Sequence, residues 1–140
     1  MATTFTKLNA GWNAEPNGSE PHAFVEGTNL VLEFLLNDMQ FPDYKNAEKE
    51  IIRFSDCWRY RIGRTNDEGW YRGQCRFSRL APTWGEFYEV QGDLLLDKLP
   101  LKWVTIGEPP PTSRHFLFYL RDQTFECDAS TWEFSVKWLG

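Results

Sequence analysis

Alternation of apolar and polar residues with a period of two recurs along this chain and predicts β-strands. In residues 50–62, Phe54, Trp58 and Tyr60 fall on one side, and arginine, serine and cysteine fall on the other. Comparable strand patterns cover residues 22–26, 30–37, 70–79, 86–96, 101–107, 114–120, 124–129 and 131–138. No segment keeps a 3.6-residue period over three turns, and Gly- and Pro-containing connections separate the runs. The pattern predicts an all-β fold: a single-domain antiparallel β-sandwich or partly closed β-barrel of about eight strands with little helix.

Residues 1–21 lack this alternation. They are polar and rich in Gly, Pro and Asn, which favours a loosely ordered N-terminal arm with Trp12 against the body, followed by a single β-domain over residues 22–140. The arm has neither the basic start nor the apolar run of a signal peptide. No stretch approaches the ~20 apolar residues that span a bilayer. We therefore expect a cytoplasmic protein that does not engage a membrane.

The segment RHFLFYLRDQTFECDA, residues 114–129, predicts a hairpin that turns at Asp122–Gln123. In that register Tyr119 lies opposite Glu126, and Leu117 lies opposite Asp128. One face is a core face, formed by Phe116, Phe118, Leu120, Phe125, Cys127 and Ala129. The other face is polar and carries His115, Tyr119, Arg121, Thr124, Glu126 and Asp128.

This polar face has two interpretations. An imidazole beside a carboxylate can transfer protons near neutral pH, so His115 and Glu126, with Tyr119, are candidate catalytic residues. Alternatively, the polar residues form the solvated side of a sheet, because no nucleophile, metal triad or glycine-rich loop accompanies them.

Asp56 interrupts the apolar side of residues 50–62. A carboxylate between Phe54 and Trp58 must be paired, protonated or lining a cavity, which makes it a further catalytic candidate. A bulge at Ser55–Asp56 would instead turn it outward.

Charge is distributed unevenly. The chain carries −5 overall, yet seven of its nine arginines lie between residues 53 and 79, where three acidic residues oppose them. If residues 50–62 pair with residues 70–79, alternation places five arginines on one surface: Arg53, Arg59, Arg61, Arg72 and Arg76. Their repulsion would be offset by an internal network, for example with Glu86, Glu89, Glu126 or Asp128, or by an anionic partner. Nucleic acid is disfavoured, because the aromatic residues alternate onto the opposite face.

Three cysteines, Cys57, Cys75 and Cys127, form no CxxC pair and have no histidine at ligand spacing. An odd number predicts free thiols in a reducing compartment and no structural zinc. We expect no cofactor and no metal.

Aromatic residues make up 16% of the chain and include seven Trp, which suits strands. Trp12, Trp84 and Trp103 fall near loops, where they would form a sugar-stacking platform. The cytoplasmic interpretation and the lack of a calcium-type acidic loop count against that idea.

Two functions from different classes compete, beside a purely structural or assembly role. The first is a binding or adaptor domain whose arginine-rich face engages an acidic protein or a small anionic ligand; its binding should weaken with salt. The second is a small β-barrel enzyme that uses His115 and Glu126 as acid and base, which should show a cavity containing His115.

Overall fold

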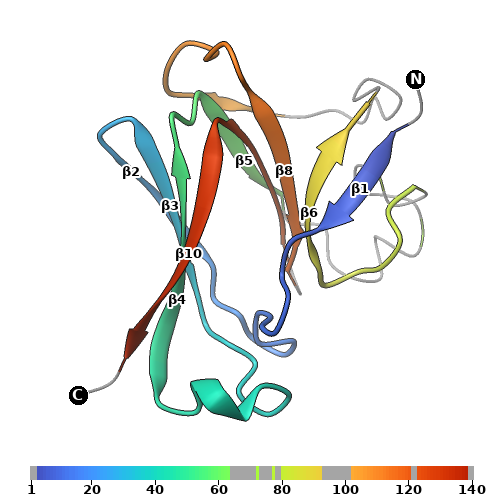
Figure 1. The fold of residues 1–140 in the computed structure, drawn as a ribbon, viewed down its shortest axis with the longest axis vertical. Coiled ribbons are helices and arrows are strands. Elements are labelled where there is room, and N and C mark those ends of the chain that lie inside the picture. The colour runs from blue at the N-terminus through green and yellow to red at the C-terminus, as the bar shows by residue number, and fades with distance from the viewer. Residues whose placement is uncertain are drawn as a thin grey trace.

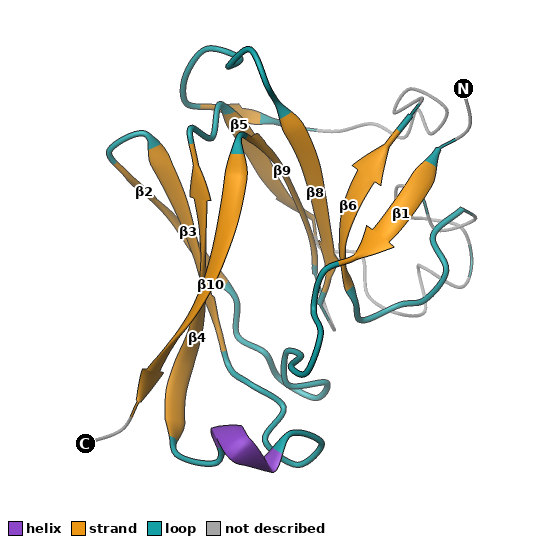
Figure 2. Cartoon of the chain, in the orientation of Figure 1, coloured by secondary structure: helices purple, strands orange, loops and turns teal. Residues whose placement is uncertain are grey.

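Two antiparallel sheets, of four and six strands, face each other and do not join into a closed barrel (Figures 1 and 2). The computed structural model describes residues 3–63, 72, 77, 80–92, 102–120 and 123–138. Within them the one helix is a short 3₁₀ turn, η1, Pro42–Tyr44. The prediction of an all-β sandwich is confirmed, and the barrel alternative is not.

The four-stranded sheet has the order β10-β4-β3-β2. Its strands are β2 (His22–Glu26), β3 (Asn29–Phe34), β4 (Ala47–Ser55) and β10 (Thr131–Trp138). The alternating residues Leu30, Leu32, Ile52 and Phe54 are fully buried toward the other sheet, as a period of two requires.

The six-stranded sheet has the order β1-β6-β8-β9-β5-β7. Its strands are β1 (Thr4–Lys7), β5 (Arg59–Gly63), β6 (Phe87–Gln91), β7 (Val104–Thr105), β8 (Arg114–Tyr119) and β9 (Thr124–Ala129). Phenylalanine dominates its inner face, where Phe87, Phe116, Phe118 and Phe125 are fully buried against the four-stranded sheet.

Residues 50–62 do not form one strand, and the expected pairing with residues 70–79 lies outside the described residues. β4 ends at Ser55, and β5 starts at Arg59 in the opposite sheet. The Cys57 N–H donates to the Thr28 carbonyl at 3.0 Å on one side, and the Trp58 N–H donates to the Asp128 carbonyl at 3.0 Å on the other. The interruption of the apolar pattern therefore marks a crossing between sheets.

Asp56 stands at this crossing with a φ of +51° and an exposed side chain. Aspartate tolerates this left-handed backbone better than most residues. The side chain of Asp56 points outward, as the bulge alternative predicted. The cause is that the chain passes from one sheet to the other at this point, not a bulge within a strand. Asp56 does not line a cavity described here.

The N-terminal segment is more ordered than a loose arm. β1 pairs with β6, with Phe5 opposite Val90, and Trp12 is 4% exposed in the core between the sheets. Its indole stacks on Phe134 with centroids 4.5 Å apart and also contacts Phe34 and Phe118. The large aromatic surface of Trp12 explains this order, because its burial offsets much of the entropy lost by the backbone.

The hairpin of β8 and β9 is buried on both faces. The polar side chains His115, Thr124, Glu126 and Asp128 are all 5% exposed or less. A second apolar cluster covers this side, formed by Phe77, Ala81, Tyr88, Val90, Leu117 and Tyr119 with Phe5 and Trp84 packed against it. The interpretation of this face as a solvated surface is therefore wrong.

The register of the hairpin also differs from the prediction. Tyr119 pairs with Thr124, Leu117 with Glu126 and His115 with Asp128. The Leu120 N–H donates to the Gln123 carbonyl at 2.9 Å, so the connection falls at residues 121–122 rather than at Asp122–Gln123. A shift of two residues leaves every side chain on its predicted face, but it brings His115 directly opposite a carboxylate.

Candidate functional site

His115 lies between two carboxylates in the six-stranded sheet. Its Nδ1 is 2.8 Å from Asp128 Oδ1, and its Nε2 is 2.7 Å from Glu126 Oε1. The register explains this arrangement, because Asp128 is directly opposite His115 and Glu126 is two residues along the same face. An imidazolium ring has two N–H donors, and both are satisfied here.

Two arginines of β5 complete the arrangement from the other side of β9. Arg59 Nε is 2.6 Å from Asp128 Oδ2, and Arg61 Nη1 is 2.8 Å from Glu126 Oε2. β5 pairs with β9 so that Arg59 is opposite Asp128 and Arg61 is opposite Glu126. We call these five residues the ion network: Arg59, Arg61, His115, Glu126 and Asp128.

Aromatic rings enclose the network. The Arg59 guanidinium carbon lies 4.5 Å from the ring centroid of Trp58 and 4.1 Å from that of Trp103. Such cation–π contacts strengthen as water is excluded. The Trp103 ring is also 6.1 Å from the imidazole of His115. A charged cluster thus sits in a largely apolar setting.

Pairing outweighs burial in the ionisation of this network. Burial alone would lower the pKa of His115, but hydrogen bonds and charge attraction from Asp128 and Glu126 raise it above the ordinary 6.5. Burial likewise would raise the pKa of Asp128, yet His115 and Arg59 lower it below 3.8. Both shifts favour the charged forms of His115 and Asp128.

The ion network lacks the arrangement expected of an acid–base pair. Each ring nitrogen of His115 is occupied by a carboxylate of the chain itself, so neither is poised to exchange a proton with a substrate. Tyr119 lies further along the face, where its ring stacks on Trp84 with centroids 5.0 Å apart. Of the four catalytic candidates, His115 and Glu126 meet, Tyr119 is displaced along β8, and Asp56 is exposed elsewhere.

The five arginines do not form one surface. Arg53 lies in β4, in the other sheet, with its Nη2 3.5 Å from Glu26 Oε1. Arg72 is exposed in a turn, while Arg76 lies outside the described residues, as do Cys75 and Arg121. Arg59 and Arg61 follow the internal-network alternative, because their partners are Asp128 and Glu126. The sheet change at Asp56 is the physical reason for the split.

A hollow of about 400 Å³ reaches the edge of the ion network. We call it the His115 hollow; it is lined by Glu89, Val90, Gln91, Gly92, Ser113, Arg114, His115 and Asp128. Arg114 holds Glu89 through two hydrogen bonds of 2.7 and 3.0 Å. The side chain of His115 is 1% exposed. The hollow therefore borders the residues around His115 rather than the ring nitrogens of His115.

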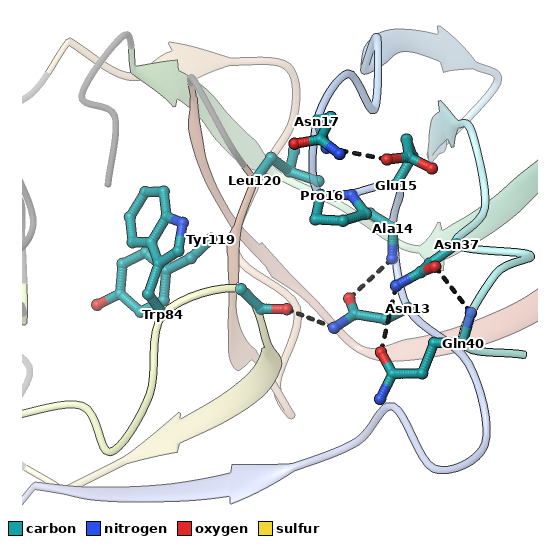
Figure 3. Close-up of a pocket in the computed structure, with 11 residues that line it drawn as sticks. Asn13, Ala14, Glu15, Pro16, Asn17, Asn37, Gln40, Trp84, Tyr119 and Leu120 are labelled. Atoms are coloured by element: carbon teal, nitrogen blue, oxygen red, sulfur yellow. Dashed lines mark hydrogen bonds between the residues drawn. The ribbon is translucent and has the colours of Figure 1, made fainter. Parts of the chain in front are cut away.

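A separate pocket of about 440 Å³ lies where four chain segments meet (Figure 3). We call it the amide pocket; its lining is Asn13, Ala14, Glu15, Pro16, Asn17, Asn37, Gln40, Trp84, Gly85, Tyr119 and Leu120. Figure 3 shows Trp84 and Tyr119 at one end and the carboxamide side chains at the other. Its volume is within the usual range of small-molecule sites.

Hydrogen bonds order the walls of the amide pocket. Asn13 Nδ2 donates to the Gly85 carbonyl at 2.7 Å, and Asn13 Oδ1 accepts from the Ala14 N–H at 2.7 Å. Asn37 Nδ2 donates to Gln40 Oε1 at 3.2 Å, and the Gln40 N–H donates back to Asn37 Oδ1 at 3.1 Å. These contacts join the N-terminal segment to the approach to β6 and fix the loop after β3.

Sequence reasoning singled out Trp84 but missed the carboxamides of this pocket. Asn13, Asn17, Asn37 and Gln40 fall in segments without periodicity, where asparagine is typical of turns. The sequence did contain one signal: these carboxamides are concentrated in two loops, one between β1 and β2 and one after β3.

Comparison with known protein families, with curated proteins and with solved structures finds no match to this chain. Among the described residues, no three histidine, cysteine or acidic side chains are grouped so as to hold a metal ion. In the same part of the chain, no helix has the length and hydrophobicity needed to cross a membrane.

Proposed function

We propose that this protein is a small-molecule binding domain whose amide pocket takes a neutral polyhydroxylated ligand of the carbohydrate class. The observation that carries the proposal is the convergence of four carboxamides and an indole from separate segments on one pocket of about 440 Å³. Carboxamides both donate and accept hydrogen bonds, as a hydroxyl does. An aromatic ring offers the apolar faces of a sugar a flat surface.

Charge supports a neutral ligand over an anionic one. Among the described residues that line this pocket, Glu15 is the one charged side chain. Arg59, Arg61 and Arg114 each face a carboxylate of the same chain at 2.8 Å or less. The binding class predicted from sequence is retained, while the arginine-rich face and its acidic protein or anionic ligand are given up. The free thiols of Cys57 and Cys127 support a reducing compartment such as the cytoplasm.

The test is NMR titration of ¹⁵N-labelled protein with glucose, N-acetylglucosamine and maltose. We expect shifts in the side-chain amides of Asn37 and Gln40 and in the Trp84 indole N–H. Gln40→Ala removes an exposed carboxamide and should weaken binding about two- to tenfold, the usual worth of one hydrogen bond.

Asn46→Ala is the matched control, because Asn46 is exposed and outside the pocket. It should bind as the unchanged protein does. Shifts confined to the His115 hollow, or binding of citrate in preference to sugars, would contradict the proposal.

A second candidate function, acid–base catalysis, has one observation in its favour: His115 and Asp128 contribute to the lining of the His115 hollow. Catalysis there would require a substrate group to displace one carboxylate from the imidazole. A ligand in that hollow that releases His115 from Asp128 would lower the pKa of His115, which an NMR titration of its ring protons would detect.

A further inference from the structure

β10 forms one end of the four-stranded sheet, and its outer edge is long and pairs with no described strand. All eight of its residues lie beside β4, and no other described strand lies along its outer side (Figure 1). An edge of this length presents a row of backbone N–H and C=O groups that can pair with another strand.

The two faces of β10 differ. Thr131, Glu133, Ser135 and Lys137 are exposed on the outer face. Trp132, Phe134 and Val136 point toward the core but are half-buried, and Trp138 is 52% exposed. These apolar side chains are incompletely covered because the sheet ends at this strand.

Contacts from within the same chain hold these aromatic rings in place. Trp12 stacks on Phe134 at 4.5 Å, and Tyr44 stacks on Trp138 at 6.1 Å with 18° between the planes. Ordering such side chains beforehand reduces the entropy cost of an association.

We propose that β10 is the interface of a two-fold symmetric homodimer, in which it pairs antiparallel with β10 of a second copy about Ser135. Glu133 then lies opposite the partner's Lys137, and symmetry forms this pair twice. Phe134 lies opposite the partner's Val136, and Trp132 lies opposite the partner's Trp138. The two four-stranded sheets become one continuous eight-stranded sheet.

The charge pattern selects this register and favours a second copy as the occupant. Directly opposite residues point to the same face of a sheet. The two-fold axis must therefore pass through a residue, because an axis between two residues would place the apolar side chains of one strand opposite the polar side chains of the other. Centring on Glu133 or on Lys137 places like charges opposite each other. Centring on Ser135 is the one register that brings Glu133 and Lys137 together, so the strand is complementary to itself.

The test is sedimentation velocity over a range of concentrations with reciprocal charge changes. Glu133→Lys and Lys137→Glu should each raise the dimer dissociation constant about tenfold or more, because each replaces two attractive pairs by two repulsive ones. The double variant E133K/K137E restores opposite charges and should dimerise again. Lys102→Glu, which reverses an exposed charge away from β10, should leave association unchanged.

Mixing the two single variants gives the sharpest result. Glu133→Lys and Lys137→Glu chains are complementary to each other, so the mixture should form heterodimers although each alone stays monomeric. A protein that is monomeric at all concentrations, a dimer insensitive to both reversals, or a mixture that remains monomeric would each overturn the proposal. Circular dichroism of every variant checks that the fold is retained.

Discussion

Glu126 in the six-stranded sheet and Glu50 in the four-stranded sheet are both fully buried, but their surroundings are opposite. Glu126 meets His115 at 2.7 Å and Arg61 at 2.8 Å. Neither carboxyl oxygen of Glu50 has a hydrogen-bond partner among the described residues. Its cross-strand neighbours are Phe34 and Val136.

Burial of Glu50 raises the pKa of its carboxyl to about 10. The comparison shows two ways to bury an acid: one keeps its charge by pairing, and the other keeps its proton. The contribution of Glu126 to stability should depend on its partners, and that of Glu50 should depend on pH.

The largest effect is expected from breaking the paired acid. Glu126→Gln removes the charge that faces Arg61 and His115, and loss of one partner from a buried ion pair costs about 3–5 kcal/mol. Phe118→Ala, at a fully buried ring, should cost about the same. Urea unfolding measures both. A loss below about 1 kcal/mol for Glu126→Gln, with Phe118→Ala unchanged in its cost, would show that water reaches this face.

Glu50→Gln should stabilise the protein at neutral pH. Because the pKa of Glu50 is raised in the folded state, the folded protein binds more protons between pH 4.5 and about 10, and its stability falls as pH rises through this range. The substitution removes this loss, worth of the order of 3 kcal/mol at neutral pH.

The measurement for Glu50 is the free energy of unfolding of both proteins as a function of pH. The gain should shrink toward zero as the pH falls to 4.5. A gain that is the same at every pH would mean that the Glu50 carboxyl is paired or hydrated in the folded protein.

Asp128 of the ion network responds to pH in the opposite direction to Glu50. The pKa of Asp128 is lowered, so its contribution is present above pH 3.8 and lost as pH falls through the folded-state value. The pKa of His115 is raised, so its contribution is present below pH 6.5 and lost as pH rises through the folded-state value. NMR titration of the imidazole should give a midpoint above 6.5; a lower midpoint would mean that burial outweighs the two carboxylates.

The smallest effect is expected at the exposed ion pair of the four-stranded sheet. Arg53 and Glu26 are 3.5 Å apart with side chains 37% and 58% exposed, so Arg53→Ser should cost less than about 0.5 kcal/mol. Arg61→Ser, at a side chain that is 12% exposed, should cost several times more. Equal melting temperatures for the two variants would contradict the view that ion pairs in the six-stranded sheet contribute more to stability than those in the four-stranded sheet.

Strand positions and the direction of side chains could be predicted from the period of two. Phe116, Phe118 and Phe125 take their predicted inner face. What lies over the polar face of β8 and β9 could not be predicted, because Phe5, Phe77 and Trp84 come from segments remote in sequence or without periodicity. An alternating strand with polar residues has the same pattern whether water or a second apolar layer covers it.

The break at Asp56 illustrates a different limit. An acid in an apolar series signals a local departure, and the left-handed backbone there gives that signal its cause. Whether the departure is a bulge or a change of sheet depends on partners such as Thr28 and Asp128, which local pattern does not contain. The amide pocket was missed for the same reason, since it exists only once four segments have met.

The strand order has a consequence for how the chain folds. β2, β3 and β4 are neighbours both in sequence and in the sheet, so this meander can pair as soon as residue 55 has been made. β5 must wait for β9, since Arg61 pairs with Glu126, and β1 must wait for β6. Such a high contact order is typical of folding in milliseconds to seconds rather than microseconds. During synthesis the pairing of β5 with β9 therefore waits for residues 124–129, whereas β1, β6 and β8 can pair before them. A ribosome-bound chain ending before residue 124 should lack the pairing of β5 with β9, and with it the ion network.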